Sequence, residues 1–195
     1  MRLSQILTAP NQLTLLRMVF LPFIILNLLD RNYKLALILF VLAGLTDTFD
    51  GIVARKLHQQ TRIGEYLDPI ADKLLLSTMF LVLAILHLIH WRYTVLVFSR
   101  DICILGVSAV LYVIAGLRNF RPSIFGKMNT LSQIAAVFFV MLHLVTNNRW
   151  AFFGRALFLH MTFAFTILSA LHYVILVGQR LRAQDTGEPP EQLAA

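Results

Sequence analysis

Four aspartates lie close together in a chain whose surroundings are apolar. The stretch from residue 45 to 77, LTDTFDGIVARKLHQQTRIGEYLDPIADKLLLS, holds five of the ten acidic residues. Asp47 and Asp50 are three apart, and Asp68 and Asp72 are four apart, so each pair shares one face of a helix. If the chain reverses at the polar and basic residues RKLHQQTR, an antiparallel pair of helices brings all four carboxylates together.

Carboxylates in such a cluster need a cation beside them. They repel one another, and at membrane depth they cost several kcal/mol, which by default marks a functional site. Their oxygens suit Mg²⁺, Mn²⁺ or Ca²⁺, and a set of two plus two carboxylates holds a pair of metals that clamps a diphosphate during displacement at phosphorus. Gly51 and Ala54 continue the face of Asp47 and Asp50, and their small size leaves room for a bulky polar group at the helix backbone.

Each of these residues also has a simpler interpretation. Asp68 followed by Pro69 is a good helix start, with the aspartate as N-cap. Asp72 and Lys73 could form an interfacial charge pair, and the basic pair 55–56 could be a membrane anchor. None of these explains all four acids on two helices with small residues between them.

The composition predicts a membrane protein. Of the 195 residues, 58% are hydrophobic and 14% are charged, against about 25% charged in a typical soluble domain, and the mean hydropathy is +0.73. The net charge of +7 is scattered along the chain rather than gathered in a basic domain, so no nucleic-acid partner is expected. The lone Cys103 excludes an internal disulfide and a cysteine-based metal site.

Six segments are apolar and long enough to cross a bilayer, which needs roughly 20 residues each. They are Leu13–Leu29, Tyr33–Ala54, Pro69–Leu88, Tyr93–Leu117, Ile124–Thr146 and Ala151–Val177. We therefore predict an all-α integral membrane protein with six transmembrane helices, antiparallel in succession, and a short interfacial helix over residues 1–9. Residues 1–182 form one membrane domain, and the polar, proline-containing residues 183–195 form a disordered tail.

The basic residues predict the orientation, because Lys and Arg concentrate on the cytoplasmic side. One side collects Arg2, Arg55, Lys56, Arg62, Arg118, Arg121, Lys127, Arg180 and Arg182, and the other collects Arg31, Lys34, Arg92, Arg149 and Arg155. The larger set places both termini and the aspartates at the cytoplasm. Asp47 lies about 21 Å along its helix from Tyr33, so the carboxylates lie inside the cytoplasmic leaflet.

The spacing of these residues resembles the signature of the CDP-alcohol phosphatidyltransferases, D-x-x-D-G-x-x-A-R-x₈-G-x₃-D-x₃-D. The matching residues are Asp47, Asp50, Gly51, Ala54, Arg55, Gly64, Asp68 and Asp72. The segments APNQLTLLRMVFLPF and PSIFGKMNTLSQ are also similar to parts of that family, so the resemblance covers most of the chain.

The resemblance implies a six-helix homodimer that transfers a phosphatidyl group from CDP-diacylglycerol to an alcohol and releases CMP. It implies two divalent cations, Mg²⁺ or Mn²⁺, held by Asp47, Asp50, Asp68 and Asp72, with Asp72 also the base that takes the proton of the acceptor hydroxyl. It assigns the nucleotide to Gly51, Ala54, Arg55 and Gly64. The nearest resemblance is to bacterial members, which implies a site in the inner (cytoplasmic) membrane that faces the cytoplasm.

The acceptor alcohol is less clearly indicated. The sequence is most similar to members that use glycerol 3-phosphate and make phosphatidylglycerophosphate, and an anionic acceptor needs cations, for which the candidates are Arg118, Arg121, Lys127 and Arg180. Arg100–Asp101 resembles instead the CMP-forming cardiolipin synthases, whose acceptor is phosphatidylglycerol. We expect these two residues to form a buried pair within the fourth helix, outside the active site.

Two other classes of protein are compatible with buried acids in six helices. A transporter or proton relay predicts acids spread along a path across the bilayer, whereas these acids form one cluster and the last two predicted spans contain none. An intramembrane prenyltransferase carries two Asp-rich modules on well-separated helices, whereas this chain carries one.

Overall fold

The computed structural model describes residues 9–57, 62–115 and 124–185, and within these ranges the chain is all-helical, with no strand. The helices are α1 (Ala9–Leu29), α2 (Tyr33–Leu57), α3 (Arg62–Ile85), α4 (Trp91–Ala115), α5 (Ile124–Thr146) and α6 (Arg149–Asp185). Their number and order confirm the all-α prediction. The interfacial helix expected over residues 1–9 falls almost wholly outside the described residues.

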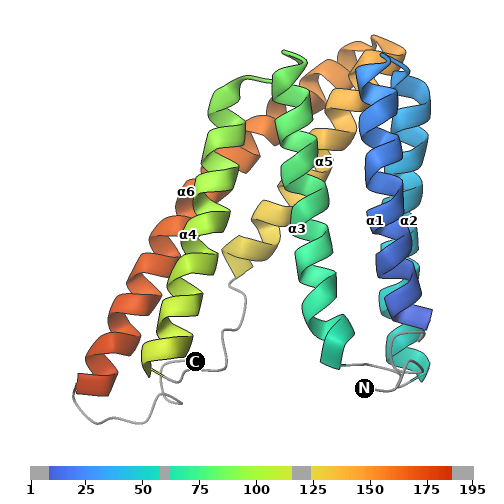
Figure 1. The fold of residues 1–195 in the computed structure, drawn as a ribbon. Helices are drawn as coiled ribbons and strands as arrows, with labels where there is room; N and C mark the ends of the chain where they lie inside the picture. Colours follow the sequence, from blue (N-terminus) through green and yellow to red (C-terminus); the bar gives the residue numbers. More distant parts are fainter. Residues whose placement is uncertain (1–8, 58–61, 116–123, 186–195) are drawn as a thin grey trace.

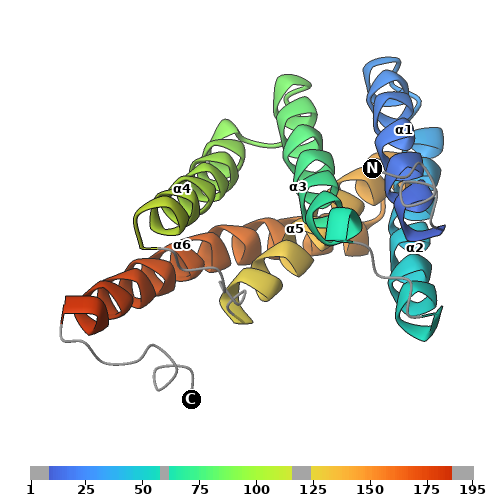
Figure 2. The ribbon, with the colours of Figure 1, turned by 60° about the horizontal axis from the view of Figure 1, so that its bottom comes forward.

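The helices run up and down in succession, with α3 in the middle of the bundle (Figure 1). Helix α3 contacts α1, α4 and α5, while α1 pairs with α2, α5 pairs with α6, and α6 also lies along α4. At the lower end in Figure 1, α2 and α4 end and α3 begins, while α5 begins higher up, near the middle of the view. Figure 2, turned so that this end comes forward, shows α5 and α6 crossing behind α3.

The three connections at the opposite end are tight turns. Arg31, His87 and Asn147 follow α1, α3 and α5 with φ of 59°, 58° and 48°, the left-handed conformation that commonly ends a helix. After α3, the His87 amide donates to Ala84 (3.0 Å) and the Leu88 amide to Leu83 (2.9 Å), and the turn after α1 has the same pattern. Paired bonds of this kind satisfy the last carbonyls of each helix, which fixes the antiparallel arrangement.

The apolar core lies between α1, α2, α3, α4 and α5. Its fully buried side chains include Ile24, Leu28, Met79, Phe80, Leu83, Val97, Val137 and Met141. The outer faces of α5 and α6 are also apolar: Ile124, Phe153 and Val174 are 77%, 64% and 69% exposed. Of the described residues, two segments, Ile124–Thr146 and Arg149–Ile175, are long and apolar enough to cross a membrane.

The largest differences from the predicted helix boundaries are at the start of α3 and the end of α6. Helix α3 begins at Arg62 rather than Pro69, so Asp68 lies inside the helix and its interpretation as an N-cap is wrong. The residues before Pro69 include Arg, Glu and Leu, which favour a helix, so α3 already begins ahead of the proline. Helix α1 likewise contains a proline, Pro22, in its interior. Helix α6 extends to Asp185, eight residues beyond the helix end predicted at Val177 and three beyond the domain boundary predicted at residue 182.

Candidate functional site

Asp72 is the signature aspartate whose side chain the structure describes. It lies in α3 about 15 Å along the helix from Arg62, where its side chain is half-buried. It lines two cavities at once, one shared with α2 and α5 and one shared with α4 and α5. A carboxylate at such a junction is within reach of groups that enter from either side.

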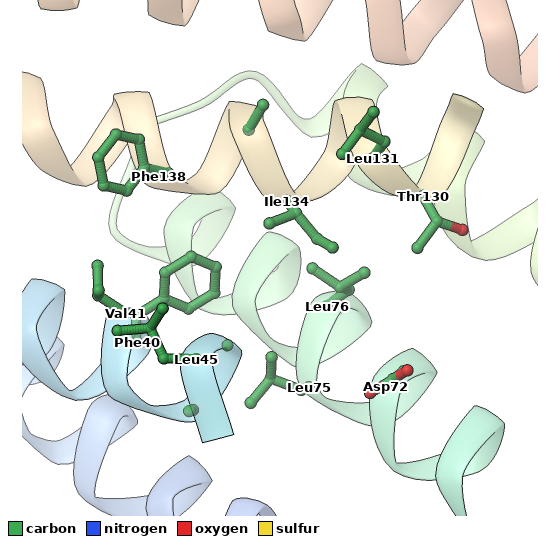
Figure 3. A pocket seen from close by; sticks show the side chains of 13 residues that line it. Phe40, Val41, Leu45, Asp72, Leu75, Leu76, Thr130, Leu131, Ile134 and Phe138 are labelled. Atoms are coloured by element: carbon green, nitrogen blue, oxygen red, sulfur yellow. The ribbon is translucent and has the colours of Figure 1, made fainter. Parts of the chain in front are cut away.

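The apolar cavity has a volume of about 490 Å³ and lies between α2, α3 and α5 (Figure 3). Its wall includes Phe40, Val41, Gly44 and Leu45 of α2, Leu75 and Leu76 of α3, and Leu131, Ile134 and Phe138 of α5. Figure 3 shows Asp72 and Thr130 at one end of the cavity and the two phenylalanines at the other. Such a wall suits a hydrocarbon chain whose polar end lies at Asp72.

The polar cavity is smaller, about 210 Å³, and lies between α3, α4 and α5. Its lining consists of Asp72, Lys73, Leu76, Arg100, Asp101, Thr130 and Gln133. Asp72, Leu76 and Thr130 belong to both cavities, so the two spaces meet at these side chains. Lys73 is close enough to Asp101 and Arg100 for their charges to interact.

Arg100 and Asp101 form the buried pair that the sequence predicted. Arg100 Nη1 donates to Asp101 Oδ1 at 2.6 Å, and the two side chains are 10% and 12% exposed. Arg100 Nη2 also donates to Ser169 Oγ of α6 at 2.8 Å. The pair was expected to lie away from the site, but both residues line the polar cavity that also contains Asp72. The sequence did contain a signal for this position, because an ionisable pair inside an apolar helix costs least free energy when its side chains face a polar space.

A polar contact between α5 and α6 supports the same region. Thr166 Oγ1 of α6 donates to Asn129 Oδ1 of α5 at 3.0 Å, and both residues are buried. Together with the Arg100–Ser169 bond, it ties α4 and α5 to α6 through side chains rather than through apolar packing alone. Interhelical hydrogen bonds of this kind stabilise helix pairs in membranes by roughly 0.6–2 kcal/mol each.

The other residues of the signature lie on the predicted helices. Asp47, Asp50, Gly51, Ala54 and Arg55 fall in the last turns of α2, while Gly64 and Asp68 fall in the first turns of α3. Their side chains are outside the described set, so the cluster of four carboxylates stays a prediction. In the part of the chain that the structure describes, α3 packs on α1, α4 and α5, and it faces α2 across the apolar cavity rather than in direct contact.

The structure describes only some of the basic residues that were expected to bind the acceptor. Lys127 is exposed on the first turn of α5 and is not part of either cavity wall. Arg118 and Arg121 lie outside the described residues, and Arg180 lies on α6 with its side chain outside the described set. The cationic side chains that the structure places beside Asp72 are instead Lys73 and Arg100.

The metal ligands are likewise only partly described. Three of the four predicted ligands, Asp47, Asp50 and Asp68, have side chains outside the described set, and the remaining side chains contain no group of three or more His, Cys, Asp or Glu. Asp72, the fourth, offers a hard carboxylate ligand at the end of the apolar cavity, which suits Mg²⁺ or Mn²⁺.

A comparison with protein families decides the class of the protein. Residues 7–178 match the model of the CDP-alcohol phosphatidyltransferase family. The chain belongs to this family. The match spans α2 and α3 with their aspartates and all other described helices up to the last turns of α6. This CDP-alcohol phosphatidyltransferase is therefore an enzyme, and the transporter and prenyltransferase alternatives are set aside.

Curated relatives carry two kinds of name. The chain is 32% identical over 180 residues to the CDP-diacylglycerol–glycerol-3-phosphate 3-phosphatidyltransferase of Bacillus subtilis (84% of this chain, 92% of that one). It is 36% identical over 129 residues to the protein of that name from Aquifex aeolicus (64% and 70%). It is also 32% identical over 148 residues to the CMP-forming cardiolipin synthase of Homo sapiens, with 67% of this chain and 48% of that one aligned.

Proposed function

We propose that this CDP-alcohol phosphatidyltransferase transfers a phosphatidyl group from CDP-diacylglycerol to an alcohol and releases CMP. The observation that carries the proposal is the position of Asp72, at the meeting point of an apolar and a polar cavity. A lipid donor and a polar acceptor must meet in this reaction, and the two cavities offer one space for each.

The apolar cavity supports a lipid donor. Its wall comes from the two signature helices and from α5, so a chain held there has its head end at Asp72. The donor diphosphate would be held by Mg²⁺ or Mn²⁺ bound to Asp47, Asp50, Asp68 and Asp72, and the metals would supply charge neutralisation for the departing CMP. Gly51, Ala54, Arg55 and Gly64 would hold the cytidine nucleotide beside them.

Asp72 acts as general base in this proposal. It accepts the proton of the acceptor hydroxyl, whose oxygen then forms a bond to the phosphorus of the phosphatidyl group. The bond between that phosphorus and the CMP oxygen breaks, and CMP leaves with the electron pair. Because Asp72 lines both cavities, it reaches a hydroxyl from the polar side while the phosphorus stands on the apolar side.

The first candidate for the acceptor is glycerol 3-phosphate, the acceptor named in the relatives from Bacillus subtilis and Aquifex aeolicus. The product would be phosphatidylglycerophosphate. Arg118, Arg121, Lys127 and Arg180 remain candidates to attract the anion toward the site. The second candidate is phosphatidylglycerol, with cardiolipin as product; the buried Arg100–Asp101 pair on the polar cavity favours it, as does the human relative.

The setting of the enzyme follows from the same proposal. All six helices cross the inner membrane of a bacterium, with the ends of α2 and α6 and the start of α3 at the cytoplasm. Residues 1–182 form the membrane domain, residues 183–195 a cytoplasmic tail, and two copies form a homodimer. The up-and-down orientation is supported by the helix ends, because α2, α4 and α6 end at one end of the bundle and the three tight turns lie at the other (Figure 1).

A direct assay tests the function. The protein is purified in detergent and given CDP-diacylglycerol with Mg²⁺ or Mn²⁺, and CMP release is measured with glycerol 3-phosphate, phosphatidylglycerol, inositol phosphate or serine. We expect CMP with one of the two glycerol-containing acceptors and none after chelation of the metal. Absence of CMP with every acceptor would refute the proposed transfer.

A further inference from the structure

Two hydrogen-bond donors on the wall of the polar cavity lack a protein partner. Gln133 is 3% exposed, and its Nε2 is buried with no acceptor in contact. Arg100 Nε is buried and unpaired as well, although the other two nitrogens of that guanidinium are bonded. A buried donor without a partner costs about 1–3 kcal/mol, so two of them on one cavity point to an oxygen-rich ligand that completes them.

We propose that the polar cavity binds the glycerol phosphate part of the acceptor, with Gln133 Nε2 and Arg100 Nε as donors to its oxygens. This inference rests on the proposed function and deepens it by assigning the acceptor to residues outside the family signature. The acceptor hydroxyl lies toward Asp72, at the end shared with the apolar cavity.

The size of the cavity limits what enters. Its volume of about 210 Å³ is below the roughly 300–1,000 Å³ of pockets that take drug-sized molecules. The cavity therefore takes a headgroup of a few heavy atoms and excludes a nucleotide or an acyl chain. The apolar cavity, more than twice as large, is the space left for the hydrocarbon.

The wall of the polar cavity offers both donors and acceptors to a polyol phosphate. The pairing with Asp101 offsets the charge of Arg100, and the bond to Ser169 fixes the plane of its guanidinium. Lys73 adds a second cation and Asp72 a second carboxylate, so the four charges on the wall balance, and Lys73 and Arg100 supply the cationic donors for phosphate oxygens. Thr130 donates its hydroxyl to Gly126, which leaves the Thr130 oxygen as an acceptor for a substrate hydroxyl.

Glycerol phosphate reaches such a cavity from two sources. It is a free molecule in glycerol 3-phosphate and a lipid headgroup in phosphatidylglycerol. The two share the glycerol hydroxyls and the phosphate oxygens that Gln133 and Arg100 would contact, so the experiment includes one arm for each.

The test replaces Gln133 with leucine, which keeps the size of the side chain and removes its amide. Steady-state CMP release is measured with glycerol 3-phosphate in one arm and detergent-solubilised phosphatidylglycerol in the other. We expect Gln133→Leu to raise KM at least tenfold for the acceptor that the wild type uses, because one hydrogen bond to a charged group is lost. The KM for CDP-diacylglycerol should stay within twofold of the wild-type value. The arm that shows activity identifies the source.

Ser132→Ala is the matched control. Ser132 is the neighbouring residue on α5 and is equally buried, but its hydroxyl donates to Met128 of the same helix and is not part of the cavity wall. It should leave both KM values unchanged. If Gln133→Leu unfolds the protein, Gln133→Glu takes its place, since a carboxylate of the same length repels the phosphate and should raise the acceptor KM by at least as much.

The outcomes separate the two proposals. If the wild type releases no CMP with any acceptor, the proposed function fails. If it is active but a folded Gln133 variant changes neither KM, or changes both equally, then the cavity is not the acceptor site and the assignment fails while the function stands. A rise confined to the acceptor KM supports the assignment.

Discussion

The two cavities that meet at Asp72 differ in every property except the residues that they share. One has a volume of about 490 Å³ and an apolar wall, and the other about 210 Å³ and a wall with four charged side chains. The apolar cavity uses α2, which carries the first half of the signature, whereas the polar cavity uses α4, which carries none of it. In the proposed assignment, both signature helices line the donor space, whereas only α3, through Asp72, links the acceptor space to the signature.

This difference offers a physical reason for the two kinds of relative. A wall built from α4 and α5 is free to change its polar residues without disturbing the aspartates on α2 and α3. Relatives named as glycerol-3-phosphate 3-phosphatidyltransferases and relatives named as cardiolipin synthases could then share one donor site. The following variants separate the contributions of the shared residue, the apolar wall and the polar wall.

Replacing the shared residue should have the largest effect. Asp72→Asn keeps the size of the side chain and removes the base, so kcat should fall by about 10²–10⁴ with either acceptor, while the melting temperature changes little. Asp30→Asn, in the exposed turn between α1 and α2 at the far end of the bundle, should leave kcat unchanged. Wild-type turnover in Asp72→Asn would remove this residue as the base.

Filling the apolar cavity should impair only the donor. A Cβ added at Gly44 meets no atom within 4 Å, and Gly44 lines the apolar cavity, so the side chain of Gly44→Leu would occupy space meant for hydrocarbon. Displacing about two methylenes at ~0.8 kcal/mol each should raise KM for CDP-diacylglycerol roughly tenfold. The acceptor KM should stay constant.

Gly106→Leu is the control for that substitution. Gly106 is also a helical glycine with open space around its Cβ position, but it lies on α4 outside both cavity walls. Equal effects of Gly44→Leu and Gly106→Leu on KM would argue against a hydrocarbon site between α2 and α3.

The helices and the spacing of the aspartates along them were easier to predict from sequence than either cavity. Spacings of three and four residues place Asp47 with Asp50 and Asp68 with Asp72, because a helix repeats every 3.6 residues. The long apolar runs likewise predicted six helices in the observed order. The spacing and the apolar runs are both local features of the sequence, so they can be interpreted without knowing how the helices pack.

The polar cavity depends on packing. Lys73, Arg100 and Gln133 come from three helices, and no spacing links them until α3, α4 and α5 are side by side. Consecutive helices were predicted to be antiparallel, which α2 and α3 are, but in the part of the chain that the structure describes these two helices face each other across the apolar cavity. A short connection makes two consecutive helices antiparallel but does not make them pack on each other. Here α1 and α5 each pack against both α2 and α3.

Removing a charge from the polar wall should have a smaller effect than filling the apolar one. Lys73→Met keeps the aliphatic stem and removes the cation, so KM for an anionic acceptor should rise about three- to fivefold at low salt, and less at high salt because salt screens the interaction. Lys34→Met, an exposed lysine at the other end of the bundle, is the control. A rise in the donor KM alone would place Lys73 on the donor side instead.

The smallest kinetic effect is expected from a change that disturbs packing away from both cavities. A Cβ at Gly154 of α6 would come within 2.4 Å of Phe139, whose ring stacks on Phe158 at 5.2 Å, so Gly154→Ala should destabilise the α5–α6 pair by about 1–3 kcal/mol. Gly178→Ala on the same helix meets no neighbour and should be neutral or stabilising, since alanine favours a helix over glycine by up to about 1 kcal/mol. The melting temperature measures both. Because neither residue lines either of the two cavities, neither KM should change. If Gly154→Ala raised the acceptor KM as Gln133→Leu does, loosened packing rather than a lost contact would explain both effects. The assignment of donor and acceptor to separate cavities would then lose its support.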